Sequence, residues 1–395
     1  MQIILFFGII TALMTLVYGY IVHRLVHGHQ AQLLSRVKIW SLAAGLALTH
    51  SIVAFIPRLT QLESKWTDAL QWFSYCILGL TALLFFLVLA RDLFRLKLHL
   101  AEKLGIASPL PTNPERREIL RKGLNWSLLG GAGFGSAVGF VQARTLAQIE
   151  KVEIDINGLD DRLRGLRIAQ ISDIHVGPTI KRDFLQSIVD QVNELKADFI
   201  AITGDLVDGS VGYLDIDIQP LAGLKAKHGT FFVTGNHEYY SGAIPWINHF
   251  RSLGIHVLNN EHHLLEHNGA PLVIAGVNDY RADRYIPEHR SDPEHALRGA
   301  PLNCTRILLA HQPRSVFAAA QCNVDLQLSG HTHGGQFMPW NFLVNLFQPY
   351  VQGLHFVRES RHPMWIYVNR GTGYWGPPNR LGIPAEISLL QLIRK

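Results

Sequence analysis

Histidine and acidic residues with the spacing of metal ligands recur in the later part of the chain. His331 and His333 stand two residues apart among glycines in the segment GHTHGGQ (330–336), directly after the strand-like run 324–328. Residues i and i+2 of an extended chain project to the same side, so both imidazoles can reach one point. Asp173 and His175 repeat this spacing. Such pairs indicate metal binding, but a pair of surface histidines gives the same pattern, so further ligands are required.

Further candidate ligands follow other apolar segments. The full set, each at or just past the end of an expected strand, is Asp173, His175, Asp205, Asn236, His311, His331 and His333. Oxygen and imidazole ligands together suit Mn, Fe, Zn, Ni or Co, and the lack of cysteine argues against a structural zinc site. Seven ligands are too many for one tetrahedral ion and about right for two. Two ions need a bridging carboxylate, for which Asp205 is the candidate, and such a pair clamps a phosphate and activates a water.

Alternating strands and helices position these residues. Periodicity predicts core strands at 166–171, 199–203, 230–234, 306–310 and 324–328, helices at 184–195 and 244–253, a hairpin at 257–277 that turns at Asn268-Gly269, and final strands near 355–357, 365–368 and 386–392. Strand–helix alternation predicts parallel pairing, and the hairpins predict mixed sheets. The expected fold class is therefore α/β, with two packed mixed sheets flanked by helices. Ligand sites in such sheets gather at the carboxyl ends of strands.

The chain begins with a different kind of sequence. Hydrophobic residues make up 48% of the chain, and the apolar excess lies almost wholly before residue 145, in the uncharged segments 3–22, 39–56 and 69–90. Each segment is long enough to cross the roughly 30 Å hydrocarbon layer as a helix. We expect His50, inside the second segment, to pack between helices. The segment 123–143 is uncharged but rich in glycine, and is either a fourth span or a flexible linker.

These patterns predict three regions. Residues 1–100 form an all-α transmembrane unit of three spans, 101–148 a basic linker plus a fourth span or a twin-arginine-like segment, and 149–395 the catalytic domain. Lysine and arginine concentrate in the loops after the first and third apolar segments, which the positive-inside rule places in the cytoplasm. Four spans would put the catalytic domain outside the cytoplasm, and three would leave it inside. The net charge of +5 is thus interpreted as a topology signal, because no basic run with interleaved aromatics indicates nucleic acid.

Five ordered blocks carry a resemblance to a known family. Asp173-x-His175, Gly204-Asp205, Gly235-Asn236-His237-Glu238, His311 and Gly330-His331-x-His333 resemble, in order and spacing, the motifs of calcineurin-like metallophosphoesterases. The likeness covers roughly residues 150–395, and the tail around 371–380 is similar to the membrane-anchored bacterial branch. The resemblance implies a four-layer α/β/β/α sandwich. It implies one metal ion held by Asp173, His175 and His333, a second completed by Asn236, His311 and His331, and Asp205 between them.

The resemblance also implies roles for residues outside the ligand set. His237 would bind no metal and would face the leaving-group oxygen as general acid or electrostatic stabiliser, so His237 and Asp205 are the expected catalytic residues. Arg380 is a candidate contact for the substrate phosphate, with a structural surface arginine as the alternative. Asp208 is a candidate supporting or substrate-binding residue, with a solvated turn aspartate as the alternative. Eight other histidines match no motif and are interpreted as surface or packing residues: His228, His249, His256, His262, His263, His267, His289 and His295.

The expected function is that of a membrane-anchored hydrolase with two divalent metal ions. It would cleave a phosphodiester, phosphomonoester or pyrophosphate, lipid-linked or of the cell envelope, by attack of metal-activated hydroxide. Its expected partners are this substrate and the membrane, with no nucleic acid. Its expected location is the bacterial cytoplasmic membrane, as a multi-pass protein with an extracytoplasmic catalytic domain. The alternatives are a UDP-2,3-diacylglucosamine-type pyrophosphohydrolase acting on the cytoplasmic side and, more remotely, an inactive sensor or scaffold, against which the complete ligand set argues.

Overall fold

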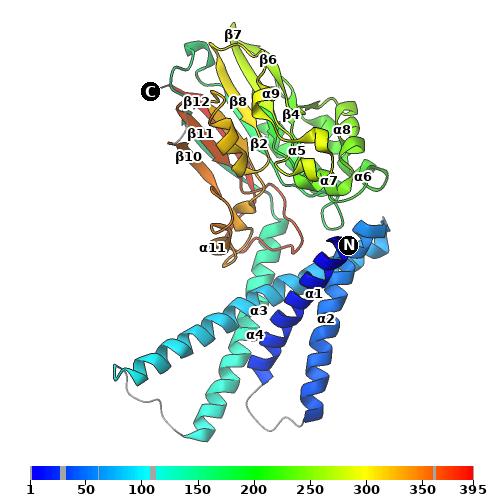
Figure 1. Ribbon diagram of the computed structural model, residues 1–395, viewed down its shortest axis with the longest axis vertical. Helices are drawn as coiled ribbons and strands as arrows, with labels where there is room; N and C mark the ends of the chain where they lie inside the picture. Colours follow the sequence, from blue (N-terminus) through cyan, green and yellow to red (C-terminus); the bar gives the residue numbers. More distant parts are fainter. Residues whose placement is uncertain (1, 27–32, 61, 107–112, 359–361, 395) are drawn as a thin grey trace. The chain divides into compact units, whose positions relative to one another are not determined.

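The chain folds into two compact units, residues 1–140 and 141–395. The computed structural model, shown in Figure 1, describes residues 2–26, 33–60, 62–106, 113–358 and 362–394. The first unit consists of helices and the second contains both sheets.

The apolar segments of the first unit are all helical. The helices are α1 (Gln2–Val26), α2 (Leu33–Thr60), α3 (Lys65–Lys103) and α4 (Pro114–Arg144), the last of which runs into the second unit. In the part of the chain that the structure describes, two helices are long and apolar enough to cross a membrane, α1 over Phe7–Leu25 and α3. Helix α2 contains a shorter apolar stretch, Trp40–Val53. Helix α4 does not meet that measure within the described residues. The number of spans therefore remains a prediction.

Polar contacts join these helices at defined points. The ring of His50 on α2 contacts the Tyr18 hydroxyl of α1 through Nδ1 (2.9 Å) and the Ser74 carbonyl of α3 through Nε2 (2.8 Å). Just beyond the apolar segments, Arg24 Nε of α1 lies 2.7 Å from Asp92 Oδ2 of α3. Buried polar groups need partners, so His50 has the helix-packing contacts expected from the sequence.

Two six-stranded mixed sheets form the second unit. The first has the strand order β1 (Gln148–Asp155), β12 (Glu386–Ile393), β2 (Arg167–Ile171), β3 (Phe199–Ile202), β4 (Thr230–Phe232), β5 (His256–Val257). The second has the order β10 (Gly353–Val357), β11 (Met364–Val368), β9 (Leu326–Ser329), β8 (Thr305–Leu309), β7 (Ala270–Gly276), β6 (Glu261–His267). Only β12–β2, β10–β11 and β6–β7 pair antiparallel among the described strands. The hairpin predicted over 257–277 is too wide, because β5 joins the first sheet and only β6 and β7 pair across Asn268-Gly269.

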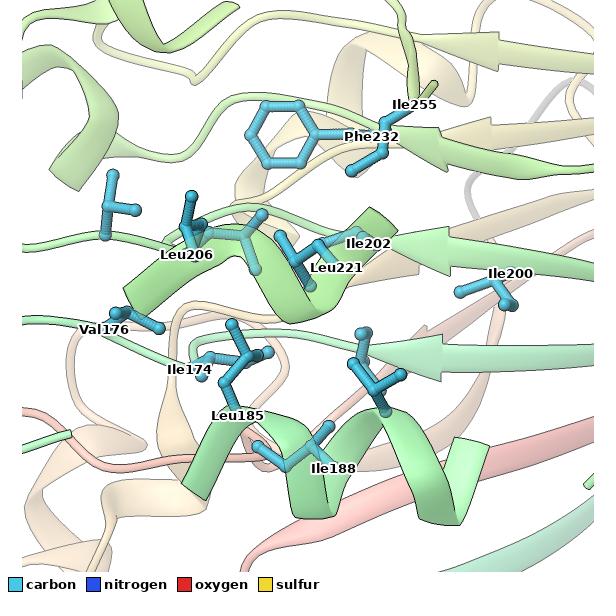
Figure 2. Close-up of a cluster of buried hydrophobic side chains, with 14 of the residues drawn as sticks. Ile174, Val176, Leu185, Ile188, Ile200, Ile202, Leu206, Leu221, Phe232 and Ile255 are labelled. Atoms are coloured by element: carbon cyan, nitrogen blue, oxygen red, sulfur yellow. The ribbon is translucent and has the colours of Figure 1, made fainter. Parts of the chain in front are cut away.

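Helices cover the outer face of each sheet, which gives the predicted α/β/β/α sandwich. The first sheet carries α5 (Arg182–Glu194), α6 (Val211–Ile218), α7 (Asn236–Ser241) and α8 (Ala243–Ser252), and the second carries α9 (Pro293–Ala296) and α10 (Val316–Ala319). Figure 2 shows Leu185 and Ile188 on the side of α5 that faces the first sheet, with Leu185 beside Ile174 in the loop after β2. The three-residue spacing of Leu185 and Ile188 puts both on one side of the helix. Between the sheets a second core contains Phe199, Phe231 and residues from both sheets.

Candidate metal centre

The carboxyl ends of five strands supply the candidate ligands. Asp173 and His175 follow β2, Asp205 follows β3, and the turn after β4 leads to Asn236 at the start of α7. In the second sheet His311 follows β8, and His331 and His333 follow β9. Strands β2, β3 and β4 are parallel neighbours, as are β8 and β9. Parallel strands end at one edge of a sheet, so each sheet brings its ligands to a common edge.

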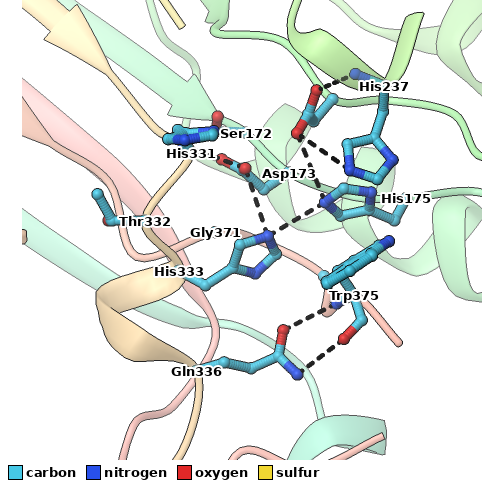
Figure 3. A network of polar contacts seen from close by, with 12 residues as sticks. Ser172, Asp173, His175, His237, His331, Thr332, His333, Gln336, Gly371 and Trp375 are labelled. Carbon is cyan, nitrogen blue, oxygen red and sulfur yellow. Dashed lines mark hydrogen bonds and ion pairs between the residues drawn. The ribbon is translucent and has the colours of Figure 1, made fainter. Parts of the chain in front are cut away.

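Asp173, His175 and His333 form the first cluster. Their ligand atoms all lie within 4.8 Å of one another. His175 Nε2 is 3.1 Å from His333 Nε2, and His333 Nε2 is 3.4 Å from Asp173 Oδ1 (Figure 3). Two nitrogens bound tetrahedrally to one ion at about 2.0–2.1 Å lie about 3.3 Å apart. The pair of histidine nitrogens therefore has the spacing that one metal ion requires.

Asp205, His311 and His331 form the second cluster. His331 Nδ1 is 3.1 Å from His311 Nε2, which is 3.1 Å from Asp205 Oδ2. The same Asp205 oxygen lies 3.9 Å from His175 Nε2 in the first cluster. One carboxylate oxygen thus faces both clusters, which is the position that a bridging ligand needs. His331 and His333 belong to different clusters, so their shared spacing does not bring them to one ion.

The free donor atoms of the centre fit bound cations. The Asn236 side-chain oxygen is buried and has no hydrogen-bond partner within the described structure, and an unpartnered buried amide oxygen is costly. The Nδ1–H of His311 donates to the Thr203 carbonyl (2.7 Å), which leaves Nε2 as the nitrogen with a free lone pair. Carboxylate, amide and imidazole donors are those of Mn, Fe, Zn, Ni or Co sites. The residues present therefore fit two divalent ions.

The backbone at the ligands is unusual. Five of the seven are non-glycine residues in the left-handed region, with φ of 54° at Asp173, 57° at His175, 53° at Asp205, 71° at His331 and 52° at His333. Non-glycine residues with positive φ are uncommon. The glycine before His331 is required for space, because a Cβ on Gly330 would lie 2.2 Å from Asp173 Oδ2.

Glu238 supports the backbone around Asp205, the candidate bridging ligand. Its buried carboxylate accepts hydrogen bonds from the backbone N–H groups of Asp205 (3.0 Å), Leu206 (2.7 Å) and Gly235 (2.6 Å). It thus ties the loop after β3 to the turn after β4. Burial, together with the charge of Asp205, raises the pKa of Glu238 to about 7.

Asp208 connects the candidate ligand His175 to the expected catalytic histidine, His237. Its Oδ2 lies 3.1 Å from His175 Nδ1, and its Oδ1 makes a short contact with His237 Nδ1. Burial by itself would raise the pKa of Asp208, but the neighbouring His237 and His175 hold it below its ordinary value. Both carboxylate oxygens are occupied by imidazoles, so the structure favours a positioning role for Asp208 and not the solvated turn or substrate contact considered from the sequence.

Arg380 is buried, unlike the surface arginine or substrate contact considered from the sequence. Its side chain is fully buried, and its guanidinium donates to the carbonyls of Arg370 (2.8 Å), His333 (3.0 Å) and Gly371 (3.2 Å) and contacts Gly373. Burial, with the nearby charge of Arg370, lowers its pKa to about 9. Since these groups occupy the guanidinium, Arg380 fixes the loop behind His333, and the predicted phosphate contact is not supported.

Aromatic residues beside His237 were missed by the sequence analysis. The ring centroids of Tyr240 and Trp375 lie 5.0 and 5.5 Å from that of His237. Gln336 holds Trp375 in place, accepting from its backbone N–H (2.9 Å) and donating to its carbonyl (2.9 Å) (Figure 3). For Trp375 the only sequence signal was the run of aromatics and glycines at 371–376. None of the eight unassigned histidines belongs to a metal-ligand cluster among the described residues.

Comparisons with known proteins agree with this geometry. The model of the family described as calcineurin-like phosphoesterase matches residues 166–335, which contain all seven candidate ligands. A Danio rerio protein named "Transmembrane protein with metallophosphoesterase domain" is 36% identical over 356 residues, which cover 88% of this chain and 78% of the relative. The chain belongs to the calcineurin-like phosphoesterase family.

Bacterial members of the calcineurin-like phosphoesterases are similar as well. An uncharacterized metallophosphoesterase of Helicobacter pylori is 37% identical over 287 residues, covering 71% of this chain and 74% of that protein. Another, from Campylobacter jejuni, is 32% identical over 354 residues, covering 88% and 87%. The family acts on phosphoesters and typically uses a dinuclear metal site, and the two clusters described above are candidates for it.

Proposed function

We propose that this protein is a membrane-anchored phosphoesterase with two metal ions, which hydrolyses a phosphodiester, phosphomonoester or pyrophosphate. The observation that carries the proposal is the position of Asp205 Oδ2, 3.1 Å from His311 Nε2 in one cluster and 3.9 Å from His175 Nε2 in the other. Asp173, His175 and His333 would hold one ion, Asn236, His311 and His331 the other, and Asp205 both. Two such ions supply Lewis-acid polarisation of a phosphoryl group and an acidified water.

His237 is proposed to act on the leaving group. An ionised Asp208 accepts a hydrogen bond, so the Nδ1 of His237 carries a proton and its Nε2 is the atom left for chemistry. That Nε2 lies 4.0 Å from Asp205 Oδ2. His237 is therefore close to the proposed bridging carboxylate but belongs to neither of the two histidine pairs proposed to hold the ions. His237 would donate a proton, or a hydrogen bond, to the departing oxygen. The backbone N–H of His237 donates to Asp205 Oδ1 (2.8 Å), which ties the catalytic histidine to the bridging ligand.

The substrate is proposed to be lipid-linked or part of the cell envelope. Two apolar helices long enough to cross a membrane, and a relative whose name includes "transmembrane", support anchoring in a bilayer. We retain a multi-pass topology in the bacterial cytoplasmic membrane with an extracytoplasmic catalytic domain as the first proposal. One observation favours the second candidate, a UDP-2,3-diacylglucosamine-type pyrophosphohydrolase on the cytoplasmic side. Within the described residues, helix α4 is not among the helices long and apolar enough to cross a membrane, and three spans would place the domain in the cytoplasm by the positive-inside rule.

Hydrolysis assays on the purified full chain test this proposal. The chain, supplied with Mn²⁺, is offered p-nitrophenyl phosphate, bis-p-nitrophenyl phosphate and a lipid pyrophosphate. Asp205→Asn and His237→Ala are compared with His355→Ala, a histidine outside the clusters that contacts the Gln352 carbonyl (2.8 Å) and the ring of Tyr350. We expect both site variants to lose hydrolysis and the control to keep it. Full activity in either site variant would refute the assignment, and equal rates on lipid and small diesters would remove the lipid argument.

Protease protection of intact cells and spheroplasts determines the side of the catalytic domain. Cleavage of residues 149–395 in intact spheroplasts would support the extracytoplasmic topology. Protection in spheroplasts, with cleavage after lysis, would support the cytoplasmic candidate.

A further inference from the structure

A long charge-free segment follows the last metal-ligand motif. Residues 334–357 contain no lysine, arginine, aspartate or glutamate. Within them, residues 338–347, here called the apolar loop, include the short helix α11 (Asn341–Val344). Phe342, Leu346 and Phe347 of this loop are 64%, 75% and 65% exposed, and Met338 and Trp340 are exposed as well. Large exposed apolar groups gathered in one segment mark an interaction surface.

The apolar loop is held next to the metal centre. It begins five residues after His333. The N–H of Met338 donates to the Leu381 carbonyl (2.9 Å), and Arg314 Nη2 donates to the Phe347 carbonyl (2.8 Å). Both ends of the loop are therefore fixed to the folded domain. Its exposed side chains are a fixed feature of the surface near His333.

The end of helix α4 contacts the same part of the domain. Gln142, in the last turn of α4, accepts a hydrogen bond from the N–H of Gly382 (3.2 Å). A Cβ on Gly382 would lie 2.8 Å from the sulfur of Met338, so the two residues are in direct contact. Two residues after Gln142, Arg144 donates to the hydroxyl of Tyr374 (3.2 Å). The loop at 371–383 thus joins the apolar loop to the helix through which the chain arrives from its apolar segments.

We propose that the apolar loop lies in the interfacial layer of the bilayer that holds the chain's own apolar helices. Three observations favour a lipid surface over a partner protein. The segment lacks every charged side chain, it combines phenylalanine, leucine and tryptophan as interfacial segments do, and it adjoins the end of α4. Covalent attachment to a membrane unit raises the effective concentration of lipid at this surface. This inference rests on the proposed membrane anchoring, and it places the metal centre at the depth of lipid phosphate groups.

Spin labelling of the full chain tests the location of the loop. Cys76, Cys304 and Cys322 are replaced by alanine, and single cysteines are introduced as Leu346→Cys or, as a matched control, Leu302→Cys. Leu302 is 79% exposed, against 75% for Leu346, but lies outside the loop. Each labelled chain is reconstituted into vesicles of phosphatidylethanolamine and phosphatidylglycerol. Collisions of the label with oxygen and with a water-soluble nickel complex are then compared.

The outcomes separate the possible occupants. We expect the label at 346 to be reached by oxygen and shielded from the nickel complex, and the label at 302 to be reached by nickel. Equal access of nickel to both labels would overturn the proposal, because the loop would then lie in water. Shielding of the label at 346 from both reagents would also overturn it, because that result indicates a protein partner.

A kinetic measurement links the loop to substrate access. The variant Leu346→Ser with Phe347→Ser should keep the turnover of a soluble diester, because neither residue belongs to the metal centre. Its KM for a lipid phosphoester in vesicles should rise about tenfold or more, since two apolar side chains leave the bilayer. An unchanged KM for the vesicle substrate would count against a role in access. Failure of the unmodified chain to hydrolyse any phosphoester would refute the proposed function alone, because the labelling result is independent of hydrolysis.

Discussion

Replacing Asp208 by asparagine tests how the centre positions its two histidines. The carboxylate of Asp208 accepts from His175 through Oδ2 and from His237 through Oδ1. An asparagine has nearly the same shape but only one oxygen, so its amide N–H₂ would face the Nδ1–H of one histidine. That histidine must then rotate or change its tautomer. Asp208→Asn therefore disturbs either a metal ligand or the expected general acid without emptying the site.

The size of the effect follows from these two contacts. Loss of a carboxylate partner from a metal-ligating histidine typically costs about 10- to 100-fold in metal affinity or activity. Loss of a positioned general acid costs about 10²- to 10⁴-fold. We expect kcat to fall about 10²- to 10⁴-fold, with a smaller change in KM, because substrate binding relies on the metal centre.

Steady-state kinetics and metal analysis distinguish the two routes. A loss caused by His237 is small for a p-nitrophenyl leaving group, which needs little protonation, and large for an alkyl leaving group, with metal content unchanged. A loss caused by His175 lowers metal content and affects both substrates alike. Asp215→Asn is the matched control, because Asp215 also contacts a histidine (His249, 3.3 Å), and neither residue belongs to the clusters. The reasoning is refuted if Asp208→Asn keeps the kcat and metal content of the unmodified chain.

Four further outcomes follow from the site and the core. Asp205→Asn should retain fewer than two ions per chain by elemental analysis, because one oxygen faces both clusters; two retained ions would contradict a bridging role. Gly330→Ala should reduce metal content, since its Cβ would lie 2.0 Å from Ser172 Oγ, whereas unchanged content would show that the turn can relax. In metal-free protein, burial alone would lower the pKa of His311, but the negative charge of Asp205 raises it above its ordinary value. The proton on His311 must leave before an ion binds, so the apparent metal affinity should rise with pH and continue to rise above the ordinary histidine pKa. Chelator competition at pH 6, 7 and 8 measures this affinity, and a flat profile would contradict the expectation. Trp246→Ala in the fully buried core should lower the free energy of unfolding by about 3–5 kcal/mol in chemical denaturation, and a loss below about 1 kcal/mol would show that the core repacks.

The sequence was sufficient to predict two mixed sheets and the gathering of the candidate ligands at their edges, for a physical reason. Short apolar segments such as 199–203 and 306–310 match buried strands. A polar residue that follows a parallel strand lies at the carboxyl edge of the sheet. The same logic could not place β5, whose two residues join the first sheet while the adjoining hairpin joins the second. Periodicity identifies a strand but carries no information about its sheet.

The residues that support the ligands could not be predicted in the same way. Asp208, Arg380 and Trp375 act through contacts with segments distant in sequence, such as Arg380 with the carbonyl of His333. A lone arginine or aspartate in a loop has no pattern that distinguishes a buried, fully bonded side chain from one that meets substrate. Arg380 illustrates the difference, because its role was decided by burial, which sequence does not report.

The positive φ angles change the reasoning that first connected His331 to His333. Same-side projection assumes an extended chain, yet both residues lie past the end of β9 with φ of 71° and 52°. In this left-handed turn the two side chains separate, one towards His311 and the other towards His175. Left-handed conformations cost non-glycine residues of order 1–3 kcal/mol each. A glycine at such a position would avoid that cost, but it would have no side chain to bind a metal ion. The chain instead places glycine beside the ligands: at Gly330 close packing leaves no room for a Cβ, and Gly334 has a φ of 60°. The folded core must therefore stabilise five strained ligand positions, which explains why the clusters lie at the ends of fully buried strands and not on exposed loops.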